Sequence, residues 1–411
     1  MAVDANPRAD YLDLTELGQE FVDDPYPFLA ELREGEAIRR VVYHGVPAWL
    51  VTRFEHAREV FSDMRLSSDL ANASDEVRAV PWISGPESLG LTKGMINLDP
   101  PAHTRLRRPV AKAFTSRRVG GLRQLTKRIG EELLDAALAR GRVDFLQEYA
   151  MPLACRGIMG LLGVPAGDTR PFQERCYILL STDPADLPKL PDALVWLSEY
   201  LGGLVAAKRA EPGEDLLSEL VAMADEGDRL SDAELRSTMF LLLVAGFATT
   251  SSLITNGLLA LLTYPDQFAA LRADPGLIPS AIEEMLRFDP SAGAALPQFA
   301  TEDLTLGGVR IRKGEAVIVS LAAANRDPRR FTDPDTFDIR RDEGHIAFAH
   351  GIHFCIGAQL ARMEGQVAFE VLLERTADVR LAVPREELSW RIHHNPRMLK
   401  SLPVILTSTR G

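Results

Sequence analysis

The chain has little of what a disulfide-stapled, zinc-binding or nucleic-acid-binding protein requires. Its 411 residues include three cysteines, at positions 155, 176 and 355, and none stands in a C-x-x-C clip, so structural disulfides and zinc sites are not expected. Basic residues are also in deficit: 46 Lys and Arg stand against 58 Asp and Glu, a formal charge of −12, which favours solubility and disfavours general affinity for nucleic acid. The first ten residues are polar and lack the apolar core of a signal peptide or membrane anchor. We therefore expect a cytoplasmic protein that binds neither nucleic acid nor a membrane.

No segment has the composition of a joint between domains. The chain contains no Gly/Ser linker, no low-complexity run and no evident internal repeat. Hydrophobic residues make up 46% of the chain and charged residues 25%, a normal balance for a globular protein that buries a sizeable core. Residues 1–411 are therefore predicted to form one large, mainly α domain.

Hydrophobic spacing predicts the order of the elements. A helix over 29–35 is followed by short strands over 37–43 and 48–52 and by a long loop over 65–94. Helical spacing then runs from 103 to 286, with interruptions at the Pro-rich segments 165–171 and 183–191.

The clearest helix is expected over 231–262, because Ser231 and Glu234 form a capping box before a long apolar run. This run is apolar on most faces, which predicts burial in the core. A membrane span is the alternative, and the Thr, Ser and Asn residues between 249 and 256 oppose it.

One cysteine lies inside a turn framed by glycines. In the segment 348–357, glycines near Cys355 let the main chain curl around the sulfur, so that backbone N–H groups could stabilise a thiolate facing a metal. The alternative is that Cys355 is a small buried hydrophobic residue. The pattern F-x-x-G-x-H-x-C-x-G resembles the haem-binding loop of the cytochrome P-450 family, in which a cysteine thiolate ligates iron and favours O–O cleavage. The resemblance implies that Cys355 binds iron, that Phe348, Gly351 and Gly357 shape the loop, and that His353 binds a haem propionate.

The segment Ala245-Gly246-Phe247-Ala248-Thr249-Thr250 resembles the oxygen-binding segment of the same family. Small side chains at Ala245 and Gly246 would let a helix approach a flat ring, and the hydroxyl of Thr249 could then bond dioxygen or a water. The alternative for Thr249 is a hydrogen bond to its own i−4 carbonyl. The family usually has an acid where this chain has Ala248, which removes a proton carrier. We hypothesise that water and a substrate group relay protons, or that the reaction needs fewer of them, as in ring closure or bond coupling.

Other segments match the family in its order along the chain. Glu284 and Arg287 resemble the E-x-x-R signature, and residues three apart share a helix face, so they could form an ion pair in the core beside the haem loop. The resemblance implies propionate donors at His103, Arg107, His345 and His353, with Gln298 where the family usually has arginine; glutamine donates a hydrogen bond without charge. The implied substrate pocket includes Trp82, Ile83, Leu243, Phe247, Ala294, Ala295 and His394.

The resemblance spans the chain from Tyr26-Pro27 to residues 401–404. It implies a mainly α, single-domain cytochrome P-450 fold: a triangular prism of helices with small β-sheets, and haem between the long central helix and the cysteine loop. The cofactor implied is heme b, iron protoporphyrin IX, and the activity is that of a monooxygenase. Its expected substrate is a small organic molecule, an intermediate of secondary metabolism, oxidised by hydroxylation or by oxidative cyclisation or coupling. The alternative is a non-catalytic haem protein that senses or binds a gas or small ligand.

Electrons must come from outside this chain, because it has neither a dinucleotide-binding glycine motif nor a cysteine cluster. The family implies NAD(P)H as the source, with ferredoxin reductase and ferredoxin as partners. Paired arginines at 107–108, 117–118, 329–330 and 340–341 could steer an acidic ferredoxin, although such pairs can also be ordinary solvated surface. We expect a monomer.

Overall fold

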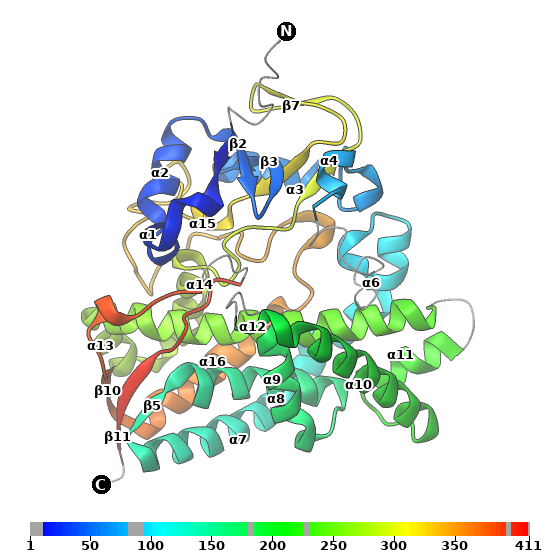
Figure 1. Cartoon of the computed structure of the whole chain (residues 1–411). Helices are drawn as coiled ribbons and strands as arrows, with labels where there is room; N and C mark the ends of the chain where they lie inside the picture. The colour runs from blue at the N-terminus through cyan, green and yellow to red at the C-terminus, as the bar shows by residue number, and fades with distance from the viewer. Residues whose placement is uncertain (1–10, 81–93, 180–184, 226–229, 392–395, 410–411) are drawn as a thin grey trace.

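The computed structural model describes residues 11–80, 94–179, 185–225, 230–391 and 396–409. Helices dominate it, and Figure 1 shows the long helices gathered in one half of the molecule and the largest sheet in the other. The longer helices are α2 (Tyr26–Glu34), α3 (Phe54–Ser62), α6 (Ala102–Ala113), α7 (Ser116–Arg140), α8 (Met151–Leu162), α9 (Thr169–Leu179), α10 (Leu190–Ala210), α11 (Leu216–Asp225), α12 (Asp232–Thr263), α13 (Pro265–Ala273), α14 (Ile278–Phe288) and α16 (Ala358–Arg375). Shorter ones are α1 (Gly18–Asp23), α4 (Asp75–Arg78), α15 (Leu321–Ala324), η2 (Leu70–Asn72), η4 (Met95–Asn97), η6 (Ala166–Asp168) and η9 (Gly351–His353).

The strands form three small sheets. The six-stranded sheet has the order β1 (Leu12–Asp13), β2 (Ile38–Tyr43), β3 (Val46–Val51), β9 (Ala316–Val319), β6 (Gln298–Ala300) and β4 (Leu66–Ser67). A three-stranded sheet joins β10 (Thr376–Leu381), β11 (Pro403–Ser408) and β5 (Arg142–Asp144), and β7 (Leu304–Leu306) pairs with β8 (Val309–Ile311). In the large sheet Gln298, the first residue of β6, pairs with Val317 of β9.

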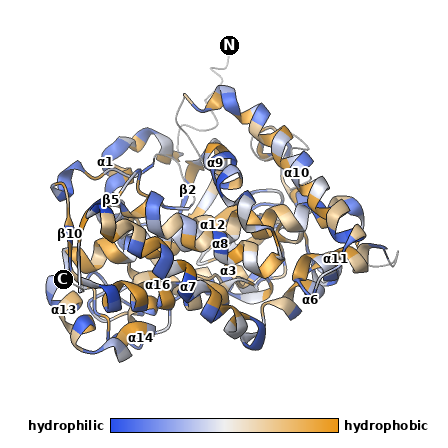
Figure 2. Ribbon diagram, turned by 90° about the horizontal axis from the view of Figure 1, so that it is seen from below, coloured by the Kyte–Doolittle hydropathy of each residue, from blue (hydrophilic) through white to orange (hydrophobic). Residues whose placement is uncertain are grey.

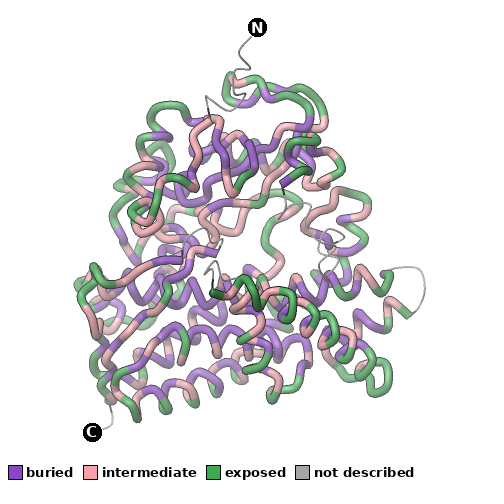
Figure 3. Tube along the Cα trace, viewed as in Figure 1, coloured by how far each residue is buried: buried purple, intermediate pink, exposed green. Residues whose placement is uncertain are grey.

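The core is built around α12. The Ser231 hydroxyl accepts a hydrogen bond from the Glu234 N–H, and the Glu234 carboxylate accepts one from the Ser231 N–H, so the predicted capping box is confirmed. The helix has 32 residues, which is about 48 Å at 1.5 Å per residue. Within the described part of the chain it is the one helix long and apolar enough to span a membrane, yet 72% of its apolar stretch is buried in the fold. Figure 3 shows the buried residues along it, and Figure 2 shows hydrophobic residues gathered among the central helices, so α12 is a core helix.

Three predicted boundaries need correction. Helix α2 begins at Tyr26, before the predicted start at 29, because Pro27 is tolerated in the first turn of a helix. Pro171 likewise lies in the first turn of α9, which begins inside the predicted interruption at 165–171. The predicted loop over 65–94 is also too simple, since its described part contains β4, η2 and α4, with Ser74 capping the last of these.

Candidate functional site

A cavity of about 330 Å³ lies between α12, the segment at 291–298 and the cysteine loop at 347–357. Most of its lining side chains are apolar. The lining residues that the sequence pointed to are Arg107, Ala245, Gly246, Thr249, Ala294, Ala295, Gln298, Phe348, His353, Cys355 and Gly357. A second, more open hollow of about 850 Å³ at the edge of the large sheet, beside Arg40 and Trp49, contains none of them.

The cysteine loop is held by its own backbone and by α3. The Cys355 N–H donates to the Phe348 carbonyl at 2.9 Å, and the Ala358 N–H donates to the Cys355 carbonyl at 3.3 Å. Gly351 has φ of +73°. A Cβ at this residue would lie 2.1 Å from the carbonyl oxygen of Phe61. Both the left-handed backbone and the close approach therefore require glycine at 351.

Cys355 is exposed and lines the cavity. Burial raises the pKa of this thiol, while the backbone N–H groups of Gly357 and Ala358 and the guanidinium groups of Arg107 and Arg362 act in the opposite direction. These groups favour the thiolate without overcoming its burial, so a cation on the cavity side would complete the stabilisation.

A group of buried polar side chains lies at the edge of the same cavity. The rings of His103 and His353 have their centroids 4.5 Å apart. Both ring nitrogens of His103, Nε2 of His353 and Oε1 of Gln298 are buried without a hydrogen-bond partner in the described part of the chain. Burial, reinforced by His103, lowers the pKa of His353 to about 4. Two neutral imidazoles beside the guanidinium of Arg107 offer unused donors where a carboxylate would be bound, so these residues fit the propionates of haem.

His345 does not belong to this group. Its Nε2 lies 3.2 Å from Oε2 of Glu283, and its Nδ1 accepts a hydrogen bond from the Ala347 N–H at 3.1 Å. It does not line the cavity and lies against Glu283, which sets it apart from the pair of His103 and His353. Its position ahead of the cysteine loop was the only signal, and position along the chain does not determine where a ring points.

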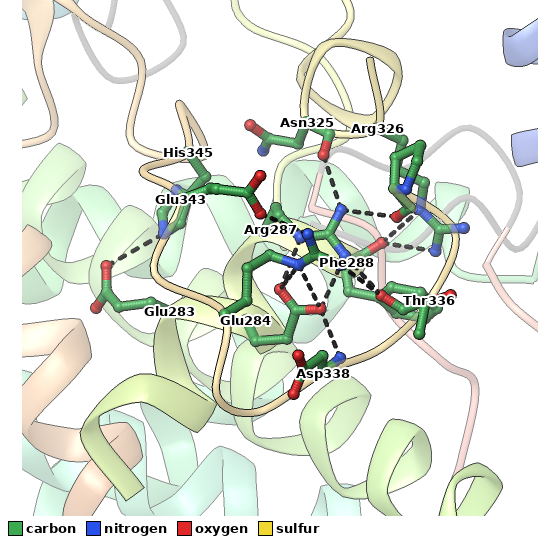
Figure 4. A network of polar contacts seen from close by, with 12 residues as sticks. Glu283, Glu284, Arg287, Phe288, Asn325, Arg326, Thr336, Asp338, Glu343 and His345 are labelled. Atoms are coloured by element: carbon green, nitrogen blue, oxygen red, sulfur yellow. Dashed lines mark hydrogen bonds and ion pairs between the residues drawn. The ribbon is translucent and has the colours of Figure 1, made fainter. Parts of the chain in front are cut away.

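Glu284 and Arg287 form a buried ion pair outside the cavity, with Arg287 Nε and Glu284 Oε2 2.6 Å apart and side chains 1% and 0% exposed. Arg287 also donates to the carbonyls of Asn325, Pro334 and Thr336 at 3.0, 2.8 and 3.1 Å (Figure 4). The Asn325 side chain in turn accepts from the Ile346 N–H at 2.9 Å. The predicted buried pair is thus present, but it organises the backbone that leads into the cysteine loop, and neither of its residues lines the cavity.

The segment at 245–250 lies in α12 with only part of it facing the cavity. The hydroxyl of Thr249 donates to the Ala245 carbonyl at 2.7 Å, which is the alternative considered from the sequence, and Thr249 still lines the cavity. A Cβ on Gly246 would lie 2.9 Å from Cγ1 of Ile158, so glycine is needed there for the packing of α8 against α12. Ala248 is 1% exposed and lies in the hydrophobic core.

Two of the predicted pocket residues are wrong. Leu243 and Phe247 are both fully buried, and the Phe247 ring packs against Phe172 of α9 at 6.2 Å. Leu241 and Leu242 line the cavity instead, since each step along a helix turns the side chain by about 100°. Trp82, Ile83 and His394 lie outside the described residues.

Sequence reasoning missed one buried acid. Glu364 in α16 is 0% exposed and has no charged partner among the described residues, while the hydroxyl of Thr250 lies within reach of its carboxyl. A Cβ at Gly157 would lie 1.9 Å from Oε1 of Glu364, so the carboxyl occupies a notch that glycine leaves in α8. Burial raises its pKa well above 4.5, and only Thr250, which lines the cavity, opposes this. The signal in the sequence was an acid at an otherwise apolar helical position: Leu360, Met363 and Val367 complete the i, i+3, i+7 pattern.

Comparison with known proteins supports the resemblance. The family model described as cytochrome P-450 matches residues 204–275 and 276–382. The monooxygenase PikC of Streptomyces venezuelae is 46% identical over 398 residues, covering 96% of this chain and 94% of PikC. The crystal structure of a myxobacterial cytochrome P-450 in complex with myristic acid superposes with a TM-score of 0.90 at 37% identity, covering 95% and 99% of the two chains. The structure of CxnD, a cytochrome P-450 for C–S bond formation in chuangxinmycin biosynthesis, gives 0.88 at 37% identity, covering 96% and 97%.

Identity at this level over nearly the whole length shows that the chain belongs to the cytochrome P-450 family. It has the mainly α fold with small sheets that the sequence predicted, and it is a haem-thiolate monooxygenase, as its curated relatives are. Membership implies haem iron, a small-molecule substrate and electrons from redox partners.

Proposed function

We propose that this enzyme oxidises a small, largely apolar intermediate of secondary metabolism, with Cys355 as the ligand of the iron in heme b. The observation that carries the proposal is the Cys355 sulfur, open to an apolar cavity on one side and surrounded by N–H and guanidinium groups on the other. Relatives that act in biosynthesis, CxnD among them, support the assignment to secondary metabolism. A gas sensor is disfavoured because the curated relatives are monooxygenases and hydroxylases.

The residues of the site divide into those that would hold the iron, those that would hold the propionates and those that surround the substrate. Cys355 would hold the iron, while His103, Arg107, His353 and Gln298 would hold the propionates. Ala245 and Thr249 form the wall on α12, and Ala294 and Ala295 leave room for a bulky substrate. When bound, haem supplies the redox chemistry that activates dioxygen. The apolar side chains keep bulk water away from the substrate and orient it.

Proton supply is assigned to Glu364 because Ala248 removes the family's usual acid. Burial raises the pKa of Glu364 well above 4.5, which favours the protonated form of its carboxyl. Thr250 stands between Glu364 and the cavity, so its hydroxyl can pass a proton from Glu364 Oε toward water at Thr249. The hydroxyl of Thr249 acts as an acceptor there, because its own proton is donated to Ala245.

The electron donor is proposed to be a ferredoxin, reduced by NAD(P)H through a ferredoxin reductase. Ile352 and Phe354 are 39% and 42% exposed on the outer side of the cysteine loop. Arg107 donates to the Phe354 carbonyl, and Arg108 beside it is exposed. In each of the other three arginine pairs one arginine forms an ion pair with a carboxylate. These arginines are Arg118, Arg329 and Arg341. The docking surface is therefore assigned to Arg108 and the apolar loop, with an acidic partner.

Two measurements test the function. The dithionite-reduced protein with carbon monoxide should show the spectrum of thiolate-ligated haem, and Cys355→Ser should abolish it. Cys176→Ser removes a thiol remote from the cavity and serves as the matched control. An unchanged carbonyl spectrum in Cys355→Ser would refute the assignment of the ligand.

Turnover with ferredoxin, its reductase and NAD(P)H, followed by mass spectrometry under labelled dioxygen, distinguishes the reaction types. Label in the product indicates hydroxylation, and an unlabelled product with fewer hydrogens indicates cyclisation or coupling. In either case Glu364→Gln should lower the product formed per electron pair, and an unchanged ratio would contradict the role given to Glu364.

We further propose that residues 1–411 form one domain and that the protein is a cytoplasmic monomer. Sedimentation of the haem-loaded protein tests the monomer, and limited proteolysis that releases a stable fragment would contradict a single domain.

A further inference from the structure

Arg391 is unlike the other buried arginines. In the part of the chain that the structure describes, the buried arginines are Arg33, Arg287, Arg326 and Arg391. Each of the first three lies within 3.5 Å of a carboxylate oxygen. Arg391 is 8% exposed, has no carboxylate partner among the described residues, and has both Nε and Nη2 buried without a hydrogen bond. A guanidinium keeps its charge at any physiological pH, and a buried charge without a counter-ion is costly, so a missing anion is the simplest explanation.

The backbone places Arg391 next to the wall of the central cavity. Its N–H donates to the Met398 carbonyl at 3.0 Å, and the N–H of Arg397 donates to the Ser291 carbonyl at 2.6 Å. Ser291 lines the cavity, so the C-terminal segment that carries Arg391 is hydrogen-bonded directly to a segment of the cavity wall. Figure 1 shows this C-terminal segment, in red, running across α12 toward the middle of the molecule.

The side chain is oriented by Tyr177 of α9. The guanidinium carbon lies 4.0 Å from the centroid of the Tyr177 ring, the distance of a cation–π contact. A guanidinium stacked on a ring keeps its N–H groups in its own plane, directed away from the ring. The face of Arg391 is therefore occupied and its Nε–Nη2 edge is unused.

That edge is the one with which this protein binds carboxylates elsewhere. Arg287 uses Nε and Nη2 for the two oxygens of Glu284, at 2.6 and 2.8 Å. Arg362 uses the same two atoms for Glu283, at 2.7 Å each. Two parallel N–H groups match the two oxygens of a carboxylate, whereas a single carbonyl oxygen satisfies only one of them.

We propose that Arg391 binds a carboxylate of the substrate, and hence that the enzyme acts on an organic acid. The inference rests on the proposed function, because it takes the central cavity as the substrate site. The acid end would lie at Arg391, and the apolar remainder would extend past the Ser291 wall toward Cys355. Arg391 selects and positions the substrate and takes no part in the chemistry.

A matched pair of probes, decanoic acid and methyl decanoate, tests the charge. Both have the same apolar chain and differ in the anionic end. Their dissociation constants are measured by calorimetry and by titration of the haem absorption band, at pH 7.5 and constant ionic strength. The acid should bind the wild type more tightly than the ester by about 10-fold or more, because hydrogen bonds to charged groups are worth more than neutral ones. An ester that binds as tightly as the acid, or an acid that does not bind at all, overturns the proposal.

Arg391→Met keeps the aliphatic stem over Tyr177 and removes the charge. It should weaken acid binding about 10- to 100-fold and leave ester binding unchanged. An equal loss for both probes would assign Arg391 a packing role only. Arg391→Lys, which restores charge without the bidentate edge, should recover part of the preference. Arg380→Met removes an exposed arginine of β10 and should change neither constant.

Two further arms separate the possible outcomes. If inorganic phosphate at the concentration of the acid abolishes the preference, Arg391 binds free anions and the substrate assignment fails. The reduced carbonyl spectrum is recorded on every preparation. If the spectrum is that of thiolate-ligated haem but the acid is not preferred, the role of Arg391 is refuted and the haem assignment stands. If calorimetry shows the acid preference but the spectrum is missing, the haem assignment is refuted and the role of Arg391 stands.

Discussion

The buried carboxyl of Glu364 makes a prediction that links stability to pH. Glu364→Gln replaces the carboxyl by an amide of the same shape that carries no charge in either state. In the folded protein the pKa of Glu364 lies well above 4.5 because of burial. In the unfolded chain the group ionises above about 4.5. The folded state therefore binds one more proton than the unfolded state between these two pKa values, and the wild type loses stability as pH rises through that window.

The size of this effect follows from linkage. One proton gives a slope of about 1.4 kcal/mol per pH unit between the two pKa values, so raising the pH from 5 to 7 should cost the wild type up to about 2.7 kcal/mol that Glu364→Gln retains. The free energy of unfolding is measured in urea at pH 5, 6 and 7, with circular dichroism as the probe. The two proteins should diverge steadily with pH, the glutamine variant becoming the more stable relative to wild type.

Glu374→Gln is the matched control on the same helix. Glu374 is 51% exposed and pairs with Lys127, so this change should shift the unfolding free energy by less than about 1 kcal/mol without growing with pH. Parallel pH profiles for wild type and Glu364→Gln would refute the claim that Glu364 is protonated in the folded protein, and with it the proton supply assigned to this residue.

Four further outcomes are expected. Arg287→Met removes the main partner of the buried Glu284 carboxylate, so it should lower the free energy of unfolding in urea by about 3–5 kcal/mol. A decrease below about 1 kcal/mol would contradict the central role of the pair. Gly157→Ala places a Cβ 1.9 Å from the buried carboxyl of α16 and should cost about 1–3 kcal/mol by the same assay. Arg107→Met should lower the haem-to-protein absorbance ratio, and full haem occupancy would show that the other donors suffice. Ala248→Asp introduces a charge at a position that is 1% exposed, so it should reduce thermal stability by several °C and change the product formed per electron pair.

Local features of the fold could be predicted because their causes lie within a few residues. The start of α12 depends on Ser231 and Glu234, three residues apart, and the structure has both hydrogen bonds of the predicted box. The turn before Cys355 needs a glycine at 351, and that residue has a left-handed backbone. The ion pair of Glu284 and Arg287 is set by helix periodicity, which places both on one face.

The predicted positions that differ from the structure depend on contacts between residues far apart in the sequence. The sequence places Leu243 and Phe247 in the cavity, yet the face of α12 that meets the cavity depends on how α9 packs against the side that carries Phe247. His345 was assigned to a propionate, yet Glu283, distant in the sequence, lies against its ring. In both cases the residue type was compatible with the prediction, and the neighbour decided the outcome.

The amino-acid order alone determined the haem-thiolate class, since the residues around Cys355, the Thr249 segment and the E-x-x-R pair recur in the family's order, and each is recognisable over a short span. Only the tertiary structure decided which polar groups would be buried with a partner and which without one. Glu364 and Arg391 are ordinary charged residues in the sequence. Their significance comes from packing that removes water from both while no described residue brings an opposite charge within reach, and such packing depends on contacts between segments far apart along the chain.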